Sequence, residues 1–307
     1  MGRYVVRRLL LTIPVLFGAT FLIFAMVYAL PGDPIAALAG DRPLAPAVAA
    51  ELKERYHLND PLLVQYGKYL GALAQGNLGT DFAGRSVSAT VAERLPVTAK
   101  LAVVAIVFEA VLGLLAGVLA GIRRGSFFDN LVLISTIGVV SIPVFVLGFV
   151  AQITLGLRLG LFPISGISQG LYSYLLPGFV LAALSVAYVA RLTRTSLVEN
   201  LRNDYVRTAK AKGLPPRTVI GKHTLRNSLI PVVTFLGADL GALLSGAIVT
   251  EGIFNIPGLG RTVFDAVISG EGPVVVGVVT LFIFFYIIFN LVVDVLYAAL
   301  DPRIRYE

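Results

Sequence analysis

The stretch that decides the fold is Asp204-Tyr205-Val206-Arg207-Thr208-Ala209-Lys210-Ala211-Lys212-Gly213-Leu214, a basic loop between two membrane-length apolar segments that leads on to Ile230-Pro231. Its pattern predicts a short helix, a glycine stop and a second helix, because Asp204 suits an N-cap, Gly213 suits a left-handed helix end and Pro215-Pro216 suits a helix start. A membrane helix bundle has little structural need for such a loop. The stretch therefore indicates a docking surface for a cytoplasmic partner, with a solvated basic loop as the competing interpretation.

The composition predicts an all-α integral membrane protein. Of 307 residues, 57% are hydrophobic and 14% are charged, whereas soluble domains are about a quarter charged. The net charge of +7 would suggest nucleic acid for a soluble chain, but long apolar runs make the lipid bilayer the expected partner and exclude nucleic acid.

Six runs are long enough to span about 30 Å of hydrocarbon as helices. They cover residues 9–30, 101–122, 131–157, 175–189, 230–249 and 274–300.

The distribution of basic residues predicts that both termini are cytoplasmic. The short loops on the opposite side carry only Arg158 and Arg261. The first apolar run is too long for the core of a signal peptide, so we expect it to be retained as a helix. The basic residues assigned to the cytoplasmic side are Arg3, Arg7, Arg8, Arg123, Arg124, Arg191, Arg194, Arg202, Arg207, Lys210, Lys212, Arg217, Lys222, Arg226, Arg303 and Arg305.

Residues 31–98 form a polar insert predicted to lie outside the membrane. A helix is expected from Pro46 to about Tyr56, and a second after Asp60-Pro61, with Asp60 as its N-cap and Gly76 as its stop. The apolar face of the second helix is expected by default to pack on the protein itself, with the membrane surface and an external partner as alternatives. Small residues at every fourth position predict close helix approach, within the bundle or in a dimer. They are Gly113, Gly117 and Gly121 in the second run and Gly237, Gly241 and Ser245 in the fifth.

Three acidic residues fall within the apolar runs: Glu109, Asp239 and Asp294. A central Asp costs about 2.5–3.5 kcal/mol on insertion scales, so each is expected to face the bundle interior, a wet path or a partner group. Asp239 is the most central of the three and either lines a translocation path or makes a buried structural hydrogen bond. Glu109 is a second candidate for the path. Asp294 is expected to have an interfacial structural role.

No catalytic or metal site is predicted in the chain. There is no Cys, and the two His residues are too few for a multi-histidine metal site. Gly166-Ile167-Ser168-Gln169-Gly170 matches G-x-S-x-G but lies in a short loop between helices, whereas a nucleophile elbow needs a strand–turn–helix. Gly221-Lys222 lacks the upstream glycine and the following Ser or Thr of a phosphate-binding loop. If ATP drives this protein, another subunit hydrolyses it.

The loop resembles the EAA loop of ABC importer permeases, with Arg207-Thr208-Ala209 where Glu-Ala-Ala stands in the general motif and Gly213 at the glycine position. The late Pro231 departs from the general motif and is similar to the dipeptide and oligopeptide (DppB/OppB-type) branch. An ordered set of further motifs covers nearly the whole chain. It comprises Leu30-Pro31-Gly32-Asp33-Pro34, Gly76-Asn77-Leu78-Gly79, Arg94-Leu95-Pro96-Val97-Thr98, Ser141-Ile142-Pro143, Ala190-Arg191-Leu192-Thr193-Arg194, Glu251-Gly252-Ile253-Phe254-Asn255-Ile256-Pro257-Gly258-Leu259-Gly260 and Asp301-Pro302-Arg303-Ile304-Arg305-Tyr306.

The resemblance implies a six-span permease of type I ABC importer architecture, forming one transmembrane domain over residues 1–307 in a bacterial or archaeal plasma membrane. It implies a second homologous permease subunit, two ATP-binding cassette subunits or domains that hold ATP and Mg, and an extracytoplasmic peptide-binding protein. No cofactor is expected in this chain. The implied cargo is a di- or oligopeptide, with nickel or glutathione as alternatives within the family. A stand-alone channel or secondary transporter is the alternative outside it.

The resemblance also assigns roles to residues. Within a cytoplasmic loop over residues 190–229, the coupling helix is expected to receive the stroke of the ATPase, with small residues giving shape and lysines gripping the rim. The loop 251–260 and the insert 31–98 are expected to form gate or receptor-facing surfaces, and Glu251, Phe254 and Asn255 are the candidate residues. The coupling residues are Arg207, Thr208, Ala209, Lys210, Ala211, Lys212, Gly213 and Leu214.

Overall fold

A computed structural model of the chain describes residues 2–29 and 45–300. The described part is helical, and its only β-pairing is an isolated bridge between Thr80 and Ser86. By length and apolar composition, four helices can cross a membrane, or up to six if each of two bent helix pairs is one span. The motif at residues 30–34, the first part of the predicted insert and the motif at residues 301–306 lie outside the described residues.

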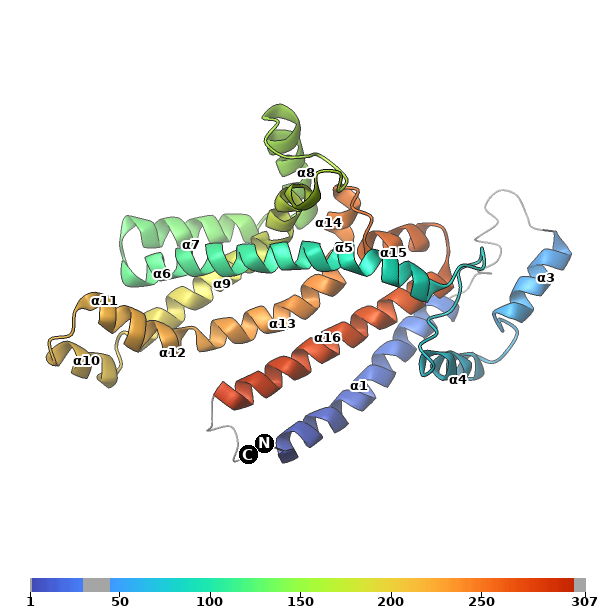
Figure 1. Cartoon of the computed structure of the whole chain (residues 1–307), viewed down its shortest axis with the longest axis horizontal. Helices are drawn as coiled ribbons and strands as arrows, with labels where there is room; N and C mark the ends of the chain where they lie inside the picture. The colour runs from blue at the N-terminus through green and yellow to red at the C-terminus, as the bar shows by residue number, and fades with distance from the viewer. Residues whose placement is uncertain (1, 30–44, 301–307) are drawn as a thin grey trace. The chain divides into compact units, whose positions relative to one another are not determined.

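The helices group into two compact units, each described here by itself. One unit contains residues 2–99 and 244–288, and the other contains residues 100–243 and 289–300. Two long helices, α5 (Val87–Phe108) and α16 (Gly272–Leu300), contribute to both (Figure 1). The first unit also holds α1 (Gly2–Tyr28), α3 (Pro46–Arg55), α4 (Leu62–Leu73), α14 (Ile248–Ile253) and α15 (Leu259–Ile268).

The second unit is built around α9 (Leu175–Asn200), which packs against α6 (Leu114–Ile122) and α7 (Phe127–Val140) (Figure 1). A π-helical turn, η1 (Glu109–Gly113), joins α5 to α6. The remaining elements are α8 (Val144–Ala151), the π-helix η2 (Gln152–Arg158), the 3₁₀ turn η3 (Gly170–Tyr174), α10 (Asp204–Ala211), α11 (Pro216–Thr218), the π-helix η4 (Val219–Leu225), α12 (Arg226–Ser228) and α13 (Ile230–Gly246).

The glycines of the second apolar run lie directly against α9. A Cβ added at Gly113 would come within 2.6 Å of Val189, one at Gly117 within 2.5 Å of the Ala190 carbonyl oxygen, and one at Gly121 within 2.9 Å of Leu197. No side chain fits at these positions, so the two backbones meet almost directly. The predicted close approach is therefore confirmed, and the partner is a helix of the same chain.

A buried ion pair fixes the turn between α6 and α7 to α9. The Arg194 guanidinium donates two hydrogen bonds to the Asp129 carboxylate, of 3.0 and 2.9 Å, and the Gly125 amide donates a third of 2.8 Å. The Asp129 side chain is 2% exposed. Because removing one partner of a buried pair leaves an unpaired charge, this bidentate contact strongly constrains the turn.

The third predicted span, a continuous helix over residues 131–157, is corrected by the structure. Its two halves, Phe127–Val140 and Val144–Arg158, meet at 102° across Ser141-Ile142-Pro143. Pro143 lacks the N–H needed to continue the helix and disfavours helical backbone at Ile142, which explains the break. The fourth run is longer than predicted, because α9 continues to Asn200. The fifth is interrupted at Ala247, between α13 and α14.

The two predicted helices of the outward insert are present. α4 packs on α1, where the Tyr66 ring lies 5.1 Å from Phe21 and its hydroxyl lies 2.8 Å from Thr20 Oγ1. Tyr66 thus packs on the protein itself, whereas Leu63 on the same predicted face is 71% exposed. Pro61, and not Asp60, occupies the N-cap position, and Asp60 instead accepts a 2.7 Å hydrogen bond from Lys68. That hydrogen bond lowers the pKa of Asp60.

The α6–α9 contact predicts a specific response to single methyl groups. Gly117→Ala places a Cβ 2.5 Å from both the Ala190 oxygen and Thr193 Cβ, and overpacking of this kind costs about 1–3 kcal/mol. We expect a lower thermal unfolding midpoint in detergent. Gly138→Ala in α7 is the matched control, because its Cβ meets nothing within 4 Å. Equal midpoints for the two variants would show that the helices have room to separate.

Candidate functional site

The predicted coupling helix is present as α10, and its C-terminus is capped by a glycine. Gly213 has φ +75°, a conformation that residues with a Cβ rarely adopt. The Gly213 amide donates to the Lys210 carbonyl at 3.0 Å, and the Leu214 amide donates to the Ala209 carbonyl at 3.3 Å. These two bonds form a Schellman motif, which satisfies carbonyls that the helix end would otherwise leave free.

The start of α10 differs from the prediction. Asn203, not Asp204, is the N-cap residue, and its side chain makes no capping hydrogen bond. Asp204 lies in the first helical turn and pairs with Arg207 at 3.3 Å, with both side chains largely exposed. An exposed pair of this kind contributes little to stability. The second predicted helix does begin at Pro216, as the α11–η4–α12 segment.

Residues 201–228, here named the coupling segment, have a small apolar core of their own. Val206, Ala209 and Val219 are 0%, 5% and 2% exposed, and Leu201 and Leu214 pack against them. Ala209 therefore contributes its small size to the interior of the segment, not to its outer surface. The predicted coupling residues that remain exposed are Arg207, Thr208, Lys210, Ala211, Lys212 and Gly213.

Hydrogen bonds tie the coupling segment to the end of α9. The Tyr205 hydroxyl donates to Asn200 Oδ1 at 2.7 Å, and the Asn200 amide donates to the Ser196 carbonyl at 2.9 Å. The buried Ser228 hydroxyl lies 3.4 Å from the same Ser196 carbonyl oxygen. Both ends of the segment are thus attached by hydrogen bonds to a single turn of α9, a helix long enough to cross a membrane.

The two acidic candidates for a translocation path lie close to each other. Glu109 is fully buried at the start of η1, and its carboxyl group interacts with that of Asp239. Neither Glu109 oxygen, nor Asp239 Oδ2, receives a hydrogen bond from another described group. Two adjacent carboxyls repel unless a proton or cation lies between them. The pair is therefore an unusual polar feature of the second unit, and its role in translocation stays a prediction.

Glu251 organises the segment that follows α13. Its side chain is fully buried. Its Oε1 accepts a 2.6 Å hydrogen bond from the Thr98 hydroxyl, and its Oε2 accepts a 2.9 Å bond from the Arg261 amide. The Thr98 hydroxyl in turn accepts a 2.8 Å bond from the Leu259 amide. One carboxyl group thus joins α5, α14 and the N-terminus of α15, where amides point outward to an acceptor.

The other two outward candidates are placed differently from each other. Phe254 is 1% exposed, so within the chain it contributes to packing. Asn255 is exposed, has φ +51° and accepts a hydrogen bond from Arg261 Nη1. Asn is one of the few residues with a Cβ that tolerates left-handed backbone. Of the three predicted gate or receptor-facing residues, only Asn255 therefore presents its side chain at the surface of the isolated chain.

Burial raises the pKa of Glu251, while its hydrogen bonds with Thr98 and the amides of Gly260 and Arg261 oppose that rise. Gly258 lies so close that an added Cβ would come within 2.4 Å of the carboxylate. Only glycine fits there. Sequence reasoning missed the role of Thr98, because 153 residues separate it from Glu251. The same holds for the 65-residue separation of Asp129 and Arg194.

Among residues 2–29 and 45–300, no group of three His, Cys, Asp or Glu side chains is placed to hold a metal ion.

Comparison with known proteins assigns the chain to a class. Residues 113–306 match the family described as "Binding-protein-dependent transport system inner membrane component", and residues 1–102 match its N-terminal membrane component. The chain belongs to this family of ABC transporter permeases. It is thus a membrane permease subunit and not itself an enzyme.

Individual relatives align over their full length. The chain is 39% identical over 335 residues to the di/tripeptide transport system permease protein DppB of Pseudomonas aeruginosa. It is 37% identical over 334 residues to the dipeptide transport system permease protein DppB of Alkalihalophilus pseudofirmus. It is 40% identical over 309 residues to the glutathione transport system permease protein GsiC of Escherichia coli. Each alignment covers 100% of both chains.

The Schellman motif predicts a difference between two substitutions at Gly213. Gly213→Val forces a β-branched residue into left-handed backbone, where even an ordinary side chain costs about 1–2 kcal/mol. We expect the Leu214 amide to exchange with deuterium about tenfold faster. Gly213→Asn is the control, because Asn tolerates this conformation and should leave exchange close to that of the wild type. Similar exchange in both variants would contradict a conformational role for the glycine.

The raised pKa of Glu251 predicts a pH dependence of stability. Between the ordinary Glu pKa of about 4.3 and its raised value, the folded state holds a proton that the unfolded state has released. Stability should therefore fall as pH rises through this window and then level off. Thermal unfolding of the purified complex as a function of pH measures this, and Glu251→Gln should remove that part of the slope. If the stability of Glu251→Gln changed with pH as steeply as that of the wild type, the pH dependence would not come from Glu251.

Proposed function

We propose that the chain is one of two membrane permease subunits of an ATP-driven importer of di- or oligopeptides. The single observation that carries the proposal is the full-length similarity to the di/tripeptide permease of Pseudomonas aeruginosa. In this proposal the chain has six spans and cytoplasmic termini, and it forms half of the translocation path. An extracytoplasmic peptide-binding protein delivers the cargo, and two ATPase subunits with ATP and Mg supply the energy.

The orientation rests on the charge bias of the loops. It places the coupling segment on the cytoplasmic side, where ATPase subunits would meet it. The exposed surface of α10 combines small residues, Thr208 and Ala211, with the basic residues Arg207, Lys210 and Lys212. Small residues allow close approach to a groove, while the flexible basic side chains can reach acidic groups around it.

The proposed mechanism is alternating access driven through α9. ATP binding closes the ATPases, and α10 moves with them. Because the coupling segment is bonded to Ser196 and Asn200, α9 follows, and because the glycines of α6 leave no gap, α6 moves with α9. Shifting a two-state equilibrium from 1:99 to 99:1 takes about 5.5 kcal/mol of differential binding. A stiff connection is needed to deliver this energy to the membrane helices.

Glutathione is a second candidate cargo. It is favoured by the 40% identity to the glutathione permease of Escherichia coli over the whole chain, and glutathione is itself a short peptide derivative. Nickel has no comparable support among these relatives. A stand-alone channel or secondary transporter is disfavoured, because the family is defined by dependence on a binding protein.

A substitution on the exposed face of α10 tests the proposed coupling. Ala211→Trp adds bulk where the ATPase would dock, without disturbing the buried core of Val206, Ala209 and Val219. We expect loss of ATP-dependent dipeptide uptake in proteoliposomes, with insertion of the chain and peptide-independent ATP hydrolysis retained if the complex assembles. Ala211→Ser is the matched control and should transport normally. Normal uptake by Ala211→Trp would refute docking through this face.

A further inference from the structure

The outward side of the first unit contains a depression of about 220 Å³ that is lined by charges of both signs. Its walls come from the start of α5, the turn before it, α15 and the loop that leads into α16. This depression, here named the charged bowl, is distinct from the coupling segment and from the Glu109–Asp239 pair. The charged side chains used below are Arg85, Arg94, Arg261, Glu93, Asp265 and Glu271.

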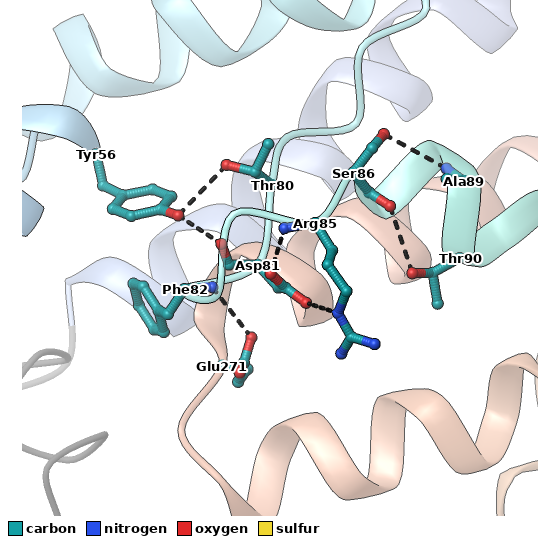
Figure 2. Close-up of polar contacts among 9 residues, drawn as sticks. All are labelled: Tyr56, Thr80, Asp81, Phe82, Arg85, Ser86, Ala89, Thr90 and Glu271. Carbon is teal, nitrogen blue, oxygen red and sulfur yellow. Dashed lines mark hydrogen bonds and ion pairs between the residues drawn. The ribbon is translucent and has the colours of Figure 1, made fainter.

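One rim of the charged bowl is fixed by hydrogen bonds, as Figure 2 shows. Asp81 is 8% exposed; its Oδ1 accepts a 2.7 Å hydrogen bond from the Arg85 amide, and its Oδ2 accepts one of 3.0 Å from Arg85 Nε. The Tyr56 hydroxyl donates to the Asp81 carbonyl at 2.6 Å. The Phe82 amide donates to Glu271 Oε2 at 3.4 Å, so the turn is also tied to the loop before α16.

The opposite wall is fixed by the buried network of Glu251. The Arg261 amide is bonded to Glu251, and the Arg261 side chain pairs with Asp265 one turn later on α15, with Nε and Oδ2 3.3 Å apart. The walls of the bowl are thus held in place without a ligand. Because they are already ordered, binding loses less conformational entropy.

Of the three arginines that line the bowl, Arg94 is the one whose Nε has no hydrogen-bond acceptor. Its Nε is buried and makes no hydrogen bond. Its ion pair with Glu93 measures 3.7 Å between Nε and Oε1, too long for a hydrogen bond. A guanidinium without a hydrogen-bonded acceptor is unfavourable, and a carboxylate is the acceptor that matches its geometry best. The Arg94 side chain is 35% exposed, so a ligand can contact it although its Nε atom is buried. By contrast, Arg85 is 80% exposed and already bonded to Asp81.

The bowl also offers anionic groups. Glu271 accepts a single long hydrogen bond, from Phe82, and Asp265 is 60% exposed beside Arg261. A ligand with both an ammonium and a carboxylate would therefore find partners for each. The volume is below the roughly 300 Å³ typical of pockets for drug-sized ligands. This size fits one end of a peptide better than a whole oligopeptide.

We propose that the charged bowl is an outward acceptor site for the carboxyl-terminal end of a zwitterionic peptide, with the Arg94 guanidinium donating to the terminal carboxylate. This site rests on the proposed function, because it takes the peptide that the binding protein releases. An acidic side chain of the binding protein has the same carboxylate chemistry. Only 35% of the Arg94 side chain is exposed and it lines the bowl, which favours a small ligand that enters the bowl.

Single-turnover transfer of peptide from the binding protein to the complex distinguishes a site for the peptide carboxylate from a site for an acidic side chain of the binding protein. The binding protein is preloaded to saturation with a dipeptide or with its C-terminal amide, and is mixed with excess intact complex in proteoliposomes with ATP. Preloading removes the selectivity of the binding protein, so the ratio of the two transfer rates reports on the permease. Wild type should transfer the free acid faster, by about tenfold, as expected for loss of one hydrogen bond to a charged group.

Three variants complete the experiment. Arg94→Gln should bring the acid-to-amide ratio close to one, Arg94→Lys should restore part of it, and Arg158→Gln, at an exposed arginine outside the bowl, should leave it as in wild type. If Arg94→Gln kept the wild-type ratio of acid to amide transfer rates, the proposed site would be refuted. Equal slowing of acid and amide by Arg94→Gln, with the ratio kept, would assign Arg94 to binding-protein docking or folding and also overturn it. If the wild-type complex transfers neither peptide, the proposed function fails and the site fails with it.

Discussion

The close approach of α6 to α9 is the contact on which the second unit depends. It requires that Gly113, Gly117 and Gly121 carry no side chain, because Val189, Ala190 and Leu197 occupy the space in which one would lie. In a bilayer, such packing replaces the hydrophobic effect as the source of helix association. With α9 held in this way, Arg194 can reach Asp129, and the turn around Ser196 becomes a fixed attachment for the coupling segment. The same helix thus serves stability and proposed force transmission.

Local sequence signals predicted the elements whose causes are local. Gly213 could be assigned to a left-handed helix end, Pro216 to a helix start and Gly113 to a close helix contact, because one residue and its neighbours determine each feature. The sequence also contained the cause of the break in the third span, since Pro143 lies in its middle. Hydropathy alone nevertheless predicted one continuous span, because it measures apolar character and not backbone geometry.

The features that sequence reasoning missed are produced by distant residues. Thr98 and Glu251 are joined across 153 residues, and nothing near either one specifies the other. Burial also redistributed the roles of predicted site residues. Ala209 was expected on the docking surface and lies inside the coupling segment. The fully buried Glu251 holds the segment after α13 together and is bonded to the amide of Arg261, which lines the charged bowl. Only the folded chain separates residues that form a surface from residues that support it.

In the proposed mechanism, the coupling segment and α9 move as one rigid body. The chain has no Cys, so Lys212→Cys and Leu184→Cys provide unique spin-label positions within it, in a complex whose other subunits lack reactive cysteines. Pulsed electron–electron double resonance would measure the distance between the two spin labels with and without trapped ATP. Rigid transmission predicts the same distance in both states. A shift of one helical turn, about 5 Å, would contradict it, because the segment would then move without carrying α9 along.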